Sequence, residues 1–208
     1  MNRVPSRLLA LSAALAGSLG LSACALLATP DPVQLHRFGA VTEDYSGVQA
    51  EAGSIEVSLR RVEFPLSSEG DRILSVTGTE AAYVAGARWV EPAQDLFTAG
   101  LEGTFSARGG RVRLLGPREL ARGTLALDVD VRNFEARYAS ADAAPVVVIT
   151  ARARLIALPG REIAAERVFT VERPAGDNRV SAIVEAFDEG TRDLTGQLVD
   201  WVETSARP

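Results

Sequence analysis

The sequence predicts a single domain of the α/β class, in which helices flank a partly antiparallel sheet. Three long segments in the second half of the chain alternate apolar and polar residues, which is the pattern of strands with one buried face. A long amphipathic helix follows them. The 208 residues are 47% hydrophobic and 24% charged, a composition that is sufficient for one well-filled core.

Residues 1–23 have the layout of a secretory signal peptide. Arg3 and Arg7 give a positive start, and an apolar stretch over residues 8–21 follows. This stretch is shorter than the ~18–20 residues that a permanent membrane-spanning helix requires. We therefore expect residues 1–23 to be removed during export.

Cys24 is predicted to carry a lipid anchor. The segment Leu21-Ser22-Ala23-Cys24 resembles the lipobox of bacterial lipoproteins, in which small residues precede the cleavage site and the thiol receives diacylglycerol. The alternative is an ordinary signal peptide with a chance cysteine, but the only cysteine of the chain stands where a lipobox requires it. Because two or more acyl chains hold a protein firmly on a membrane, a triacylated Cys24 predicts a lasting anchor.

The residue after Cys24 indicates which membrane holds the anchor. In bacteria with two membranes, an aspartate at this position favours retention at the inner membrane, and here the position is Ala25. We therefore expect the protein on the outer membrane, facing the periplasm. Residues 24–32, with Pro30 and Pro32, are interpreted as a lipidated tether. Residues 33–208 form the predicted domain.

The first half of this domain is expected to hold short strands and one helix. The expected strands cover residues 33–38, 54–62, 73–76 and 81–84. A polar loop over residues 41–53, a turn over residues 65–70 and Gly78 separate them. A helix is expected over residues 91–107, with Pro92 in its first turn and Gly109-Gly110 as its stop.

The second half is expected to be an antiparallel meander closed by a helix. After a short strand over residues 111–115, the long strands cover residues 125–132, 147–155 and 161–171, and the helix covers residues 178–204, where Gly190 is a candidate bend. Acids alternate along the first long strand and arginines along the second. Such rows pair across a sheet at ~0.2–1 kcal/mol for each pair.

The sequence contains no catalytic motif, and we predict no catalytic residue, metal site or cofactor. His36, the only histidine, is interpreted as a surface or edge-strand residue rather than a ligand or base. Alternation places Asp128 and Asp130 on a solvated sheet face, which we favour over a catalytic carboxylate pair. Trp89 and Trp201 are interpreted as packing residues rather than binding anchors.

The charge of the chain excludes one class of partner. The formal net charge is −5, and the signal peptide removes two arginines and no acids, so that the mature part is more acidic still. Because nucleic-acid binding requires a basic face, we expect no nucleic acid among the partners.

Residues 65–101 carry a family resemblance. Asp71-Arg72-Ile73-Leu74 leads a strand, Tyr83 follows, and Arg88-Trp89-Val90-Glu91-Pro92 enters the helix. Together with the meander, a last helix ending in Trp201-Val202 and the lipobox, this pattern resembles the ABC-type transport auxiliary lipoprotein family. The Arg-Trp-x-Glu-Pro block is the most specific part of the pattern. The rest of the resemblance lies in the order of the strands and helices.

The resemblance implies a mixed sheet flanked by helices, similar to the amino-terminal domain of TolB. It also implies a periplasm-facing lipoprotein without chemistry of its own. Its expected partners are a mammalian-cell-entry (MCE) domain protein and an ABC transporter or related membrane subunits, which together move lipid between membranes. The family analogy also allows a homo-oligomer, namely a ring of identical copies around a tubular MCE assembly. Arg72, Tyr83, Trp89 and Pro92 are candidate partner-surface or structural residues.

Two other functions compete with this expectation. A structural lipoprotein for outer-membrane assembly, unrelated to MCE transport, would have the same anchor. An enzyme such as a periplasmic hydrolase would need a catalytic constellation that the sequence does not show.

Overall fold

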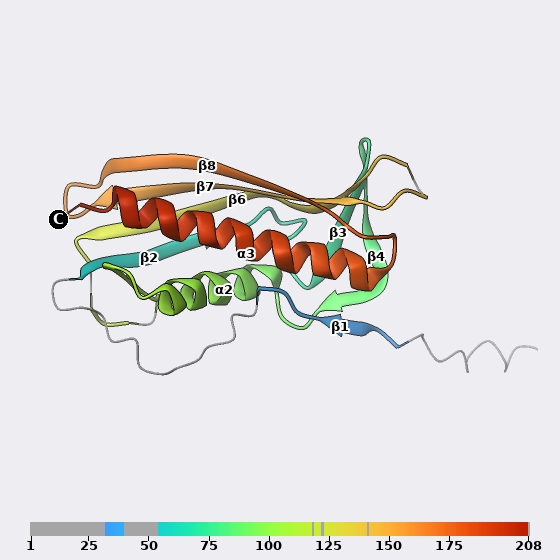
Figure 1. Ribbon diagram of the computed structural model, residues 1–208, viewed down its shortest axis with the longest axis horizontal. Coiled ribbons are helices and arrows are strands. Elements are labelled where there is room, and N and C mark those ends of the chain that lie inside the picture. Colours follow the sequence, from blue (N-terminus) through green and yellow to red (C-terminus); the bar gives the residue numbers. More distant parts are fainter. Residues whose placement is uncertain (1–31, 40–53, 118, 122, 141, 208) are drawn as a thin grey trace, which may run out of the picture. The chain divides into compact units, whose positions relative to one another are not determined.

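The computed structural model describes residues 32–39, 54–117, 119–121, 123–140 and 142–207. The predicted signal peptide, Cys24 and the predicted loop over residues 41–53 lie outside these residues. Val33–Pro208 form one compact unit. Its described part contains an eight-stranded mixed sheet with two α-helices on one face, which confirms the α/β class (Figure 1).

Each expected strand is present, and several are longer than predicted. The strands are β1 (Gln34–His36), β2 (Ile55–Glu63), β3 (Arg72–Thr77), β4 (Glu80–Trp89), β5 (Val112–Leu115), β6 (Leu125–Tyr138), β7 (Val146–Ala157) and β8 (Glu162–Pro174). The largest extensions are in β6, which continues to Tyr138, and in β4, which continues to Trp89 through Gly86, a glycine with a positive φ of 68°. The periodicity did not predict this half of β4.

Strands β6, β7 and β8 form the predicted antiparallel meander. Leu127 lies opposite Leu155 and Val129 opposite Ala153, and these apolar side chains face the helices. The acid and arginine rows also face each other as predicted, because Asp128 pairs with Arg154 and Asp130 with Arg152 in the register.

The other edge of β6 has an arrangement that alternation does not encode. The first half of β6 pairs with β2, its last residues pair with β3, and both pairings are parallel. Strand β5 then lies parallel to β2, β4 antiparallel to β3, and β1 parallel to β4. Parallel neighbours require crossover connections, and the chain supplies these through the segments between β2, β3 and β6.

The two helices are α2 (Ala93–Arg108) and α3 (Val180–Ser205), within two residues of the predicted bounds at each end. Helix α2 ends at Gly109, whose left-handed conformation (φ 55°) closes the last turn. Gly190 lies inside the continuous helix α3, where a Cβ would come within 3.2 Å of the Ile149 side chain on β7. Its small size lets helix and sheet approach closely.

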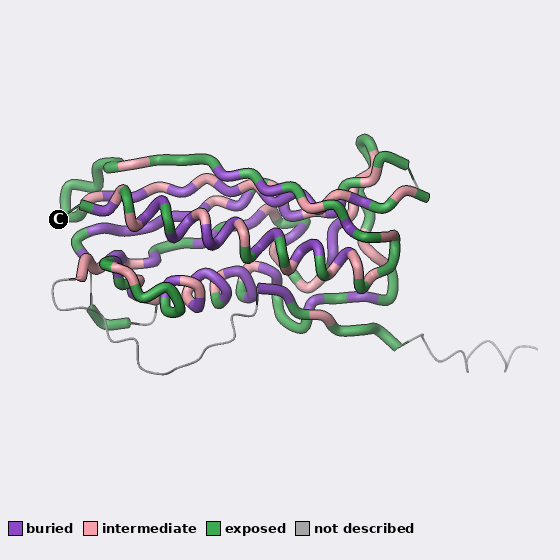
Figure 2. The backbone as a smooth tube through the Cα atoms, in the orientation of Figure 1, coloured by how far each residue is buried: buried purple, intermediate pink, exposed green. Residues whose placement is uncertain are grey.

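The core lies between the sheet and the two helices (Figure 2). Helix α3 lies against β7 and β8 and buries Ile183, Phe187, Leu194 and Leu198 in this core, which confirms the predicted apolar stripe. Most residues of β8 are exposed, because this strand forms one edge of the sheet.

The segment after β1 is held between the two helices. The backbone N–H of Gly39 donates a hydrogen bond to Asp188 of α3 (2.8 Å), and its carbonyl oxygen lies against Gly100 of α2. A Cβ at Gly100 would stand 2.9 Å from that oxygen, closer than packed atoms allow.

We expect Gly100→Ala to lower the free energy of unfolding by about 1–3 kcal/mol, because overpacking against a backbone carbonyl cannot be relieved by a side-chain rotation. Gly196→Ala in α3 is the matched control. Its new methyl meets only the end of the flexible Arg108 side chain, and we expect a gain of up to ~1 kcal/mol from helix propensity. Urea unfolding of the mature protein carrying Cys24→Ser measures both, and equal effects would contradict the close approach.

Candidate partner-binding face

The most specific part of the sequence pattern is buried. Trp89 is 2% exposed and packs edge-on against Phe38 (centroids 4.7 Å apart) and Phe187 (5.3 Å). Phe134 of β6 also touches Phe38 and Phe187, so that β4, β6, α3 and the segment after β1 meet in one aromatic cluster. The Trp89 side chain is therefore part of the core and presents nothing to a partner.

Pro92 organises the start of α2. It occupies the N-cap position without a side-chain cap, and backbone carbonyls replace that cap. The N–H of Ala93 donates to the carbonyl of Gly70 (2.9 Å), and the N–H of Gln94 donates to that of Glu69 (3.2 Å). The free N–H groups of the helix start are thus satisfied by the segment that leads into β3.

Arg72 and Tyr83 form an accessible pair. The Arg72 guanidinium lies 3.7 Å from the centroid of the Tyr83 ring, within the range of a cation–π contact. Ser75 lies beside the buried Ala136, so the alternating side chains of Arg72 and Leu74 point to the opposite side of the sheet. Arg72 is exposed and Tyr83 is half-buried.

The side of the sheet opposite the helices is called the open face here. Besides Arg72 and Tyr83 it carries a network of charges from three neighbouring strands. The network consists of Arg60, Arg61 and Glu63 of β2, Asp128 and Asp130 of β6, and Arg152 and Arg154 of β7. No helix covers this face in the part of the chain that the structure describes (Figure 1).

Asp128 corrects one expectation. It lies on the predicted face, but its side chain is 2% exposed instead of solvated. Arg60 binds both carboxylate oxygens, one of them at 2.8 Å from Nε, and Arg61 lies 3.5 Å away. The hydrogen bond to Asp128, and then its charge, raise the pKa of Arg60. Asp130, at 31%, stays partly exposed.

Arg60 and Arg61 were missed by the sequence analysis, although the sequence holds a signal for them. Two adjacent arginines interrupt the alternation of the strand, and the structure has a register shift between Leu59 and Arg61. This irregularity is typical of a β-bulge, and it directs both guanidinium groups towards Asp128.

His36 and Trp201 occupy structural positions. His36 lies on the edge strand β1 beside Trp89, and its Nε2 is buried without a hydrogen-bond partner among the described residues. Trp201 is 8% exposed and packs edge-on against Phe169 of β8, with ring centroids 5.8 Å apart.

The grooves on the surface of the described residues include two that border the sheet. The larger, of about 510 Å³, lies where β6 passes from β2 to β3, and is lined by Glu63, Glu69, Gln94, Asp130 and Arg132 among others. The smaller, of about 330 Å³, lies between β3, β4 and the start of α3. Tyr138 lines the smaller groove and donates a hydrogen bond to Asn178 (2.9 Å); burial raises the pKa of its hydroxyl.

Two kinds of feature are absent from the described residues. They hold no group of three or more His, Cys, Asp or Glu side chains arranged to bind a metal ion. None of the helices in this part of the chain has the length and apolar character needed to span a membrane.

Comparison with known proteins identifies relatives of the sequence and of the fold. A family model described as the ABC-type transport auxiliary lipoprotein component matches residues 41–199. The crystal structure of a Xanthomonas campestris protein assigned to the family DUF330 is similar, with a TM-score of 0.66 and 23% identity over 83% of this chain and 95% of that one. The crystal structure of an uncharacterized protein has a TM-score of 0.65 and 13% identity over 83% and 99%. No curated protein matches the sequence.

We expect Asp128→Asn to lower the free energy of unfolding by about 2 kcal/mol, because Arg60 would lose a buried charged acceptor. The control is Asp130→Asn. Its ion pairs are 3.5 Å or longer and partly exposed, so we expect a change of less than ~1 kcal/mol. Urea unfolding at neutral pH measures both variants. An equal, small effect of the two substitutions would show that Asp128 is not the centre of the network.

Proposed function

Because this chain belongs to the family of ABC-type transport auxiliary lipoprotein components, we propose that it serves an intermembrane lipid transport system. In this proposal an MCE-domain protein carries the lipid, and an ABC transporter or a related membrane subunit drives transport. The protein is the lipid-anchored auxiliary component on the periplasmic side of the outer membrane. The family match over residues 41–199 is the observation that carries the proposal.

The role we propose is binding without catalysis. Family membership is that of a transport auxiliary, and the acids and arginines of the open face pair with one another in ion pairs. Protein interfaces favour arginine and tyrosine, and Arg72 with Tyr83 offers both on an accessible surface. We therefore propose this pair as part of the contact with the MCE-domain protein, whereas Trp89 and Pro92 hold the surrounding fold.

The partner is tested by copurification. We expect the carboxy-terminally tagged, lipidated protein to recover an MCE-domain protein from lightly cross-linked cells. The double substitution Arg72→Gln, Tyr83→Leu is expected to reduce the recovery at least ~10-fold, since loss of an interface anchor costs ~1.4 kcal/mol or more. Cys24→Ser is expected to preserve the contact with the soluble domain.

Arg108→Gln is the matched control, because this exposed arginine lies in the helix layer and pairs with Asp200. The circular dichroism of each variant verifies folding. Recovery of β-barrel assembly factors alone would favour a structural outer-membrane lipoprotein instead. The apparent mass of the purified complex tests whether the protein is a homo-oligomer.

The membrane location is tested by substituting Ala25, the residue after the predicted anchor. We expect the wild type in the outer-membrane fraction and the variant Ala25→Asp in the inner-membrane fraction, because an aspartate at this position favours retention. Ala25→Ser is the control and is expected to behave like the wild type. Sucrose-gradient separation with immunoblotting measures the distribution, and an inner-membrane location of the wild type would contradict the proposed outer-membrane site.

A further inference from the structure

Two arginines of the open face are left with weak partners. Arg154 comes no closer to Asp128 than 4.0 Å, and Arg152 lies 3.6 Å from Asp130 and 4.0 Å from Glu166. Asp128 is already engaged by Arg60 at hydrogen-bond distance. The acid row that faces these two arginines in the register therefore does not saturate their donors.

Both arginines also carry a buried donor without an acceptor. The Nε atoms of Arg152 and Arg154 are inaccessible to solvent and have no hydrogen-bond partner among the described residues. Leaving such a donor unpaired costs free energy, so neither guanidinium group is fully satisfied within the fold. The side chains as a whole remain 29% and 22% exposed, so parts of them other than Nε can be reached from solution.

The spacing of the two side chains suits one oxyanion. Arg152 and Arg154 are two residues apart on β7 and face the same side, roughly 7 Å apart along the strand. Guanidinium groups extend several ångströms from the strand and can converge on one group between them. A phosphate offers oxygens to two guanidinium forks at once, whereas a single carboxylate is filled by one fork.

Apolar side chains lie beside this arginine pair. In the register of β7 and β8, Val168 is opposite Arg152, and Ile163 is opposite Ile156. Val168 is 52% exposed and Ile163 is 58% exposed, although both are aliphatic. Glu166 lies opposite Arg154 in the same register, between Val168 and Ile163 on β8. The open face thus presents two cationic groups beside one carboxylate and two uncovered apolar groups on the edge strand.

We propose that Arg152 and Arg154 form a binding site for a phosphate group, and that Val168 and Ile163 contact the apolar part of the molecule that carries it. The ligand class is an anionic glycerophospholipid headgroup or free phosphate, which share the recognised group. The site is separate from the Arg72–Tyr83 pair, and it does not depend on the identity of the transport partner.

The experiment uses the purified mature protein carrying Cys24→Ser and follows the arginine Nε–Hε resonances by nuclear magnetic resonance. The probes are inorganic phosphate, dihexanoyl phosphatidylglycerol and dihexanoyl phosphatidylcholine, the two lipids below their micelle concentrations. We expect saturable shifts of the Arg152 and Arg154 signals. Arg152→Gln and Arg154→Gln are each expected to weaken binding about tenfold, as loss of one charge-assisted hydrogen bond predicts.

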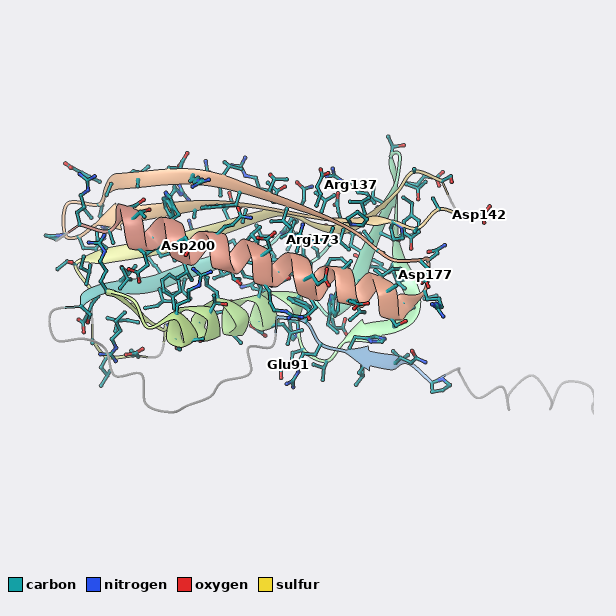
Figure 3. All side chains as sticks on the ribbon, in the orientation of Figure 1. Glu91, Arg137, Asp142, Arg173, Asp177 and Asp200 are labelled. Carbon is teal, nitrogen blue, oxygen red and sulfur yellow. The ribbon has the colours of Figure 1, made fainter. Side chains whose placement is uncertain are left out.

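Arg137→Gln is the control, because Arg137 pairs with Glu135 (2.7 Å) at the other end of β6 and is exposed (Figure 3). We expect it to bind like the wild type, which separates a local site from general charge. Thermal unfolding of each variant verifies that the fold is intact. If the ligand is a lipid headgroup, phosphatidylglycerol is expected to bind more tightly than inorganic phosphate. Val168→Thr is then expected to remove this difference in affinity.

A free-anion source predicts that phosphate binds as well as either lipid and that Val168→Thr has no effect; this result supports the site with phosphate as its ligand. Unchanged Nε–Hε signals with all three probes would overturn the proposal. Equal weakening by Arg137→Gln would also overturn it, because the anion would then follow the charge of the whole face. Neither result would bear on recovery of the MCE-domain protein.

Discussion

The structure depends on strand β6, which is shared by two halves of the sheet. One edge of β6 carries the antiparallel meander with β7 and β8, and the other edge carries β2 and then β3 in succession. Its side chains point in turn to the aromatic core, through Phe134, and to the charged open face, through Asp128. A single strand therefore fixes the position of both the hydrophobic cluster and the ion-pair network.

Local periodicity was sufficient to place the helices and strands along the chain, although not the full length of β4 and β6, and it did not indicate which strands pair with each other. The stripe of α3, the stop of α2 at Gly109 and the meander all follow from short-range patterns that a sequence displays directly. The parallel pairing of β2 and β3 with the same strand depends on long-range packing, which leaves no local pattern. For the same reason alternation gave the correct face for Asp128 but could not reveal the Arg60 side chain that covers it.

The residues of the candidate site were likewise predicted only in part. The sequence pattern pointed to Arg72, Tyr83, Trp89 and Pro92 as one group, and the structure separates them by environment. Trp89 belongs to the aromatic core and Pro92 to a helix start, while Arg72 and Tyr83 stack where solvent reaches them. A residue that identifies a family is thus distinct from a residue that a partner can touch. The arginine pair on β7 was visible in the sequence only as one side of an ion-pair row.

The short strand β1 has a mechanical consequence. It is the first element after the predicted tether, and its hydrogen bonds to β4 are continued by Val90 N–H to the His36 carbonyl (2.8 Å). Phe38 and Gly39 then enter the core and the gap between the helices. Any force from a membrane anchor would reach the domain through these bonds and through the buried Phe38 ring. The buried ring of Phe38 therefore fastens this edge strand to the domain at the point where the chain enters it.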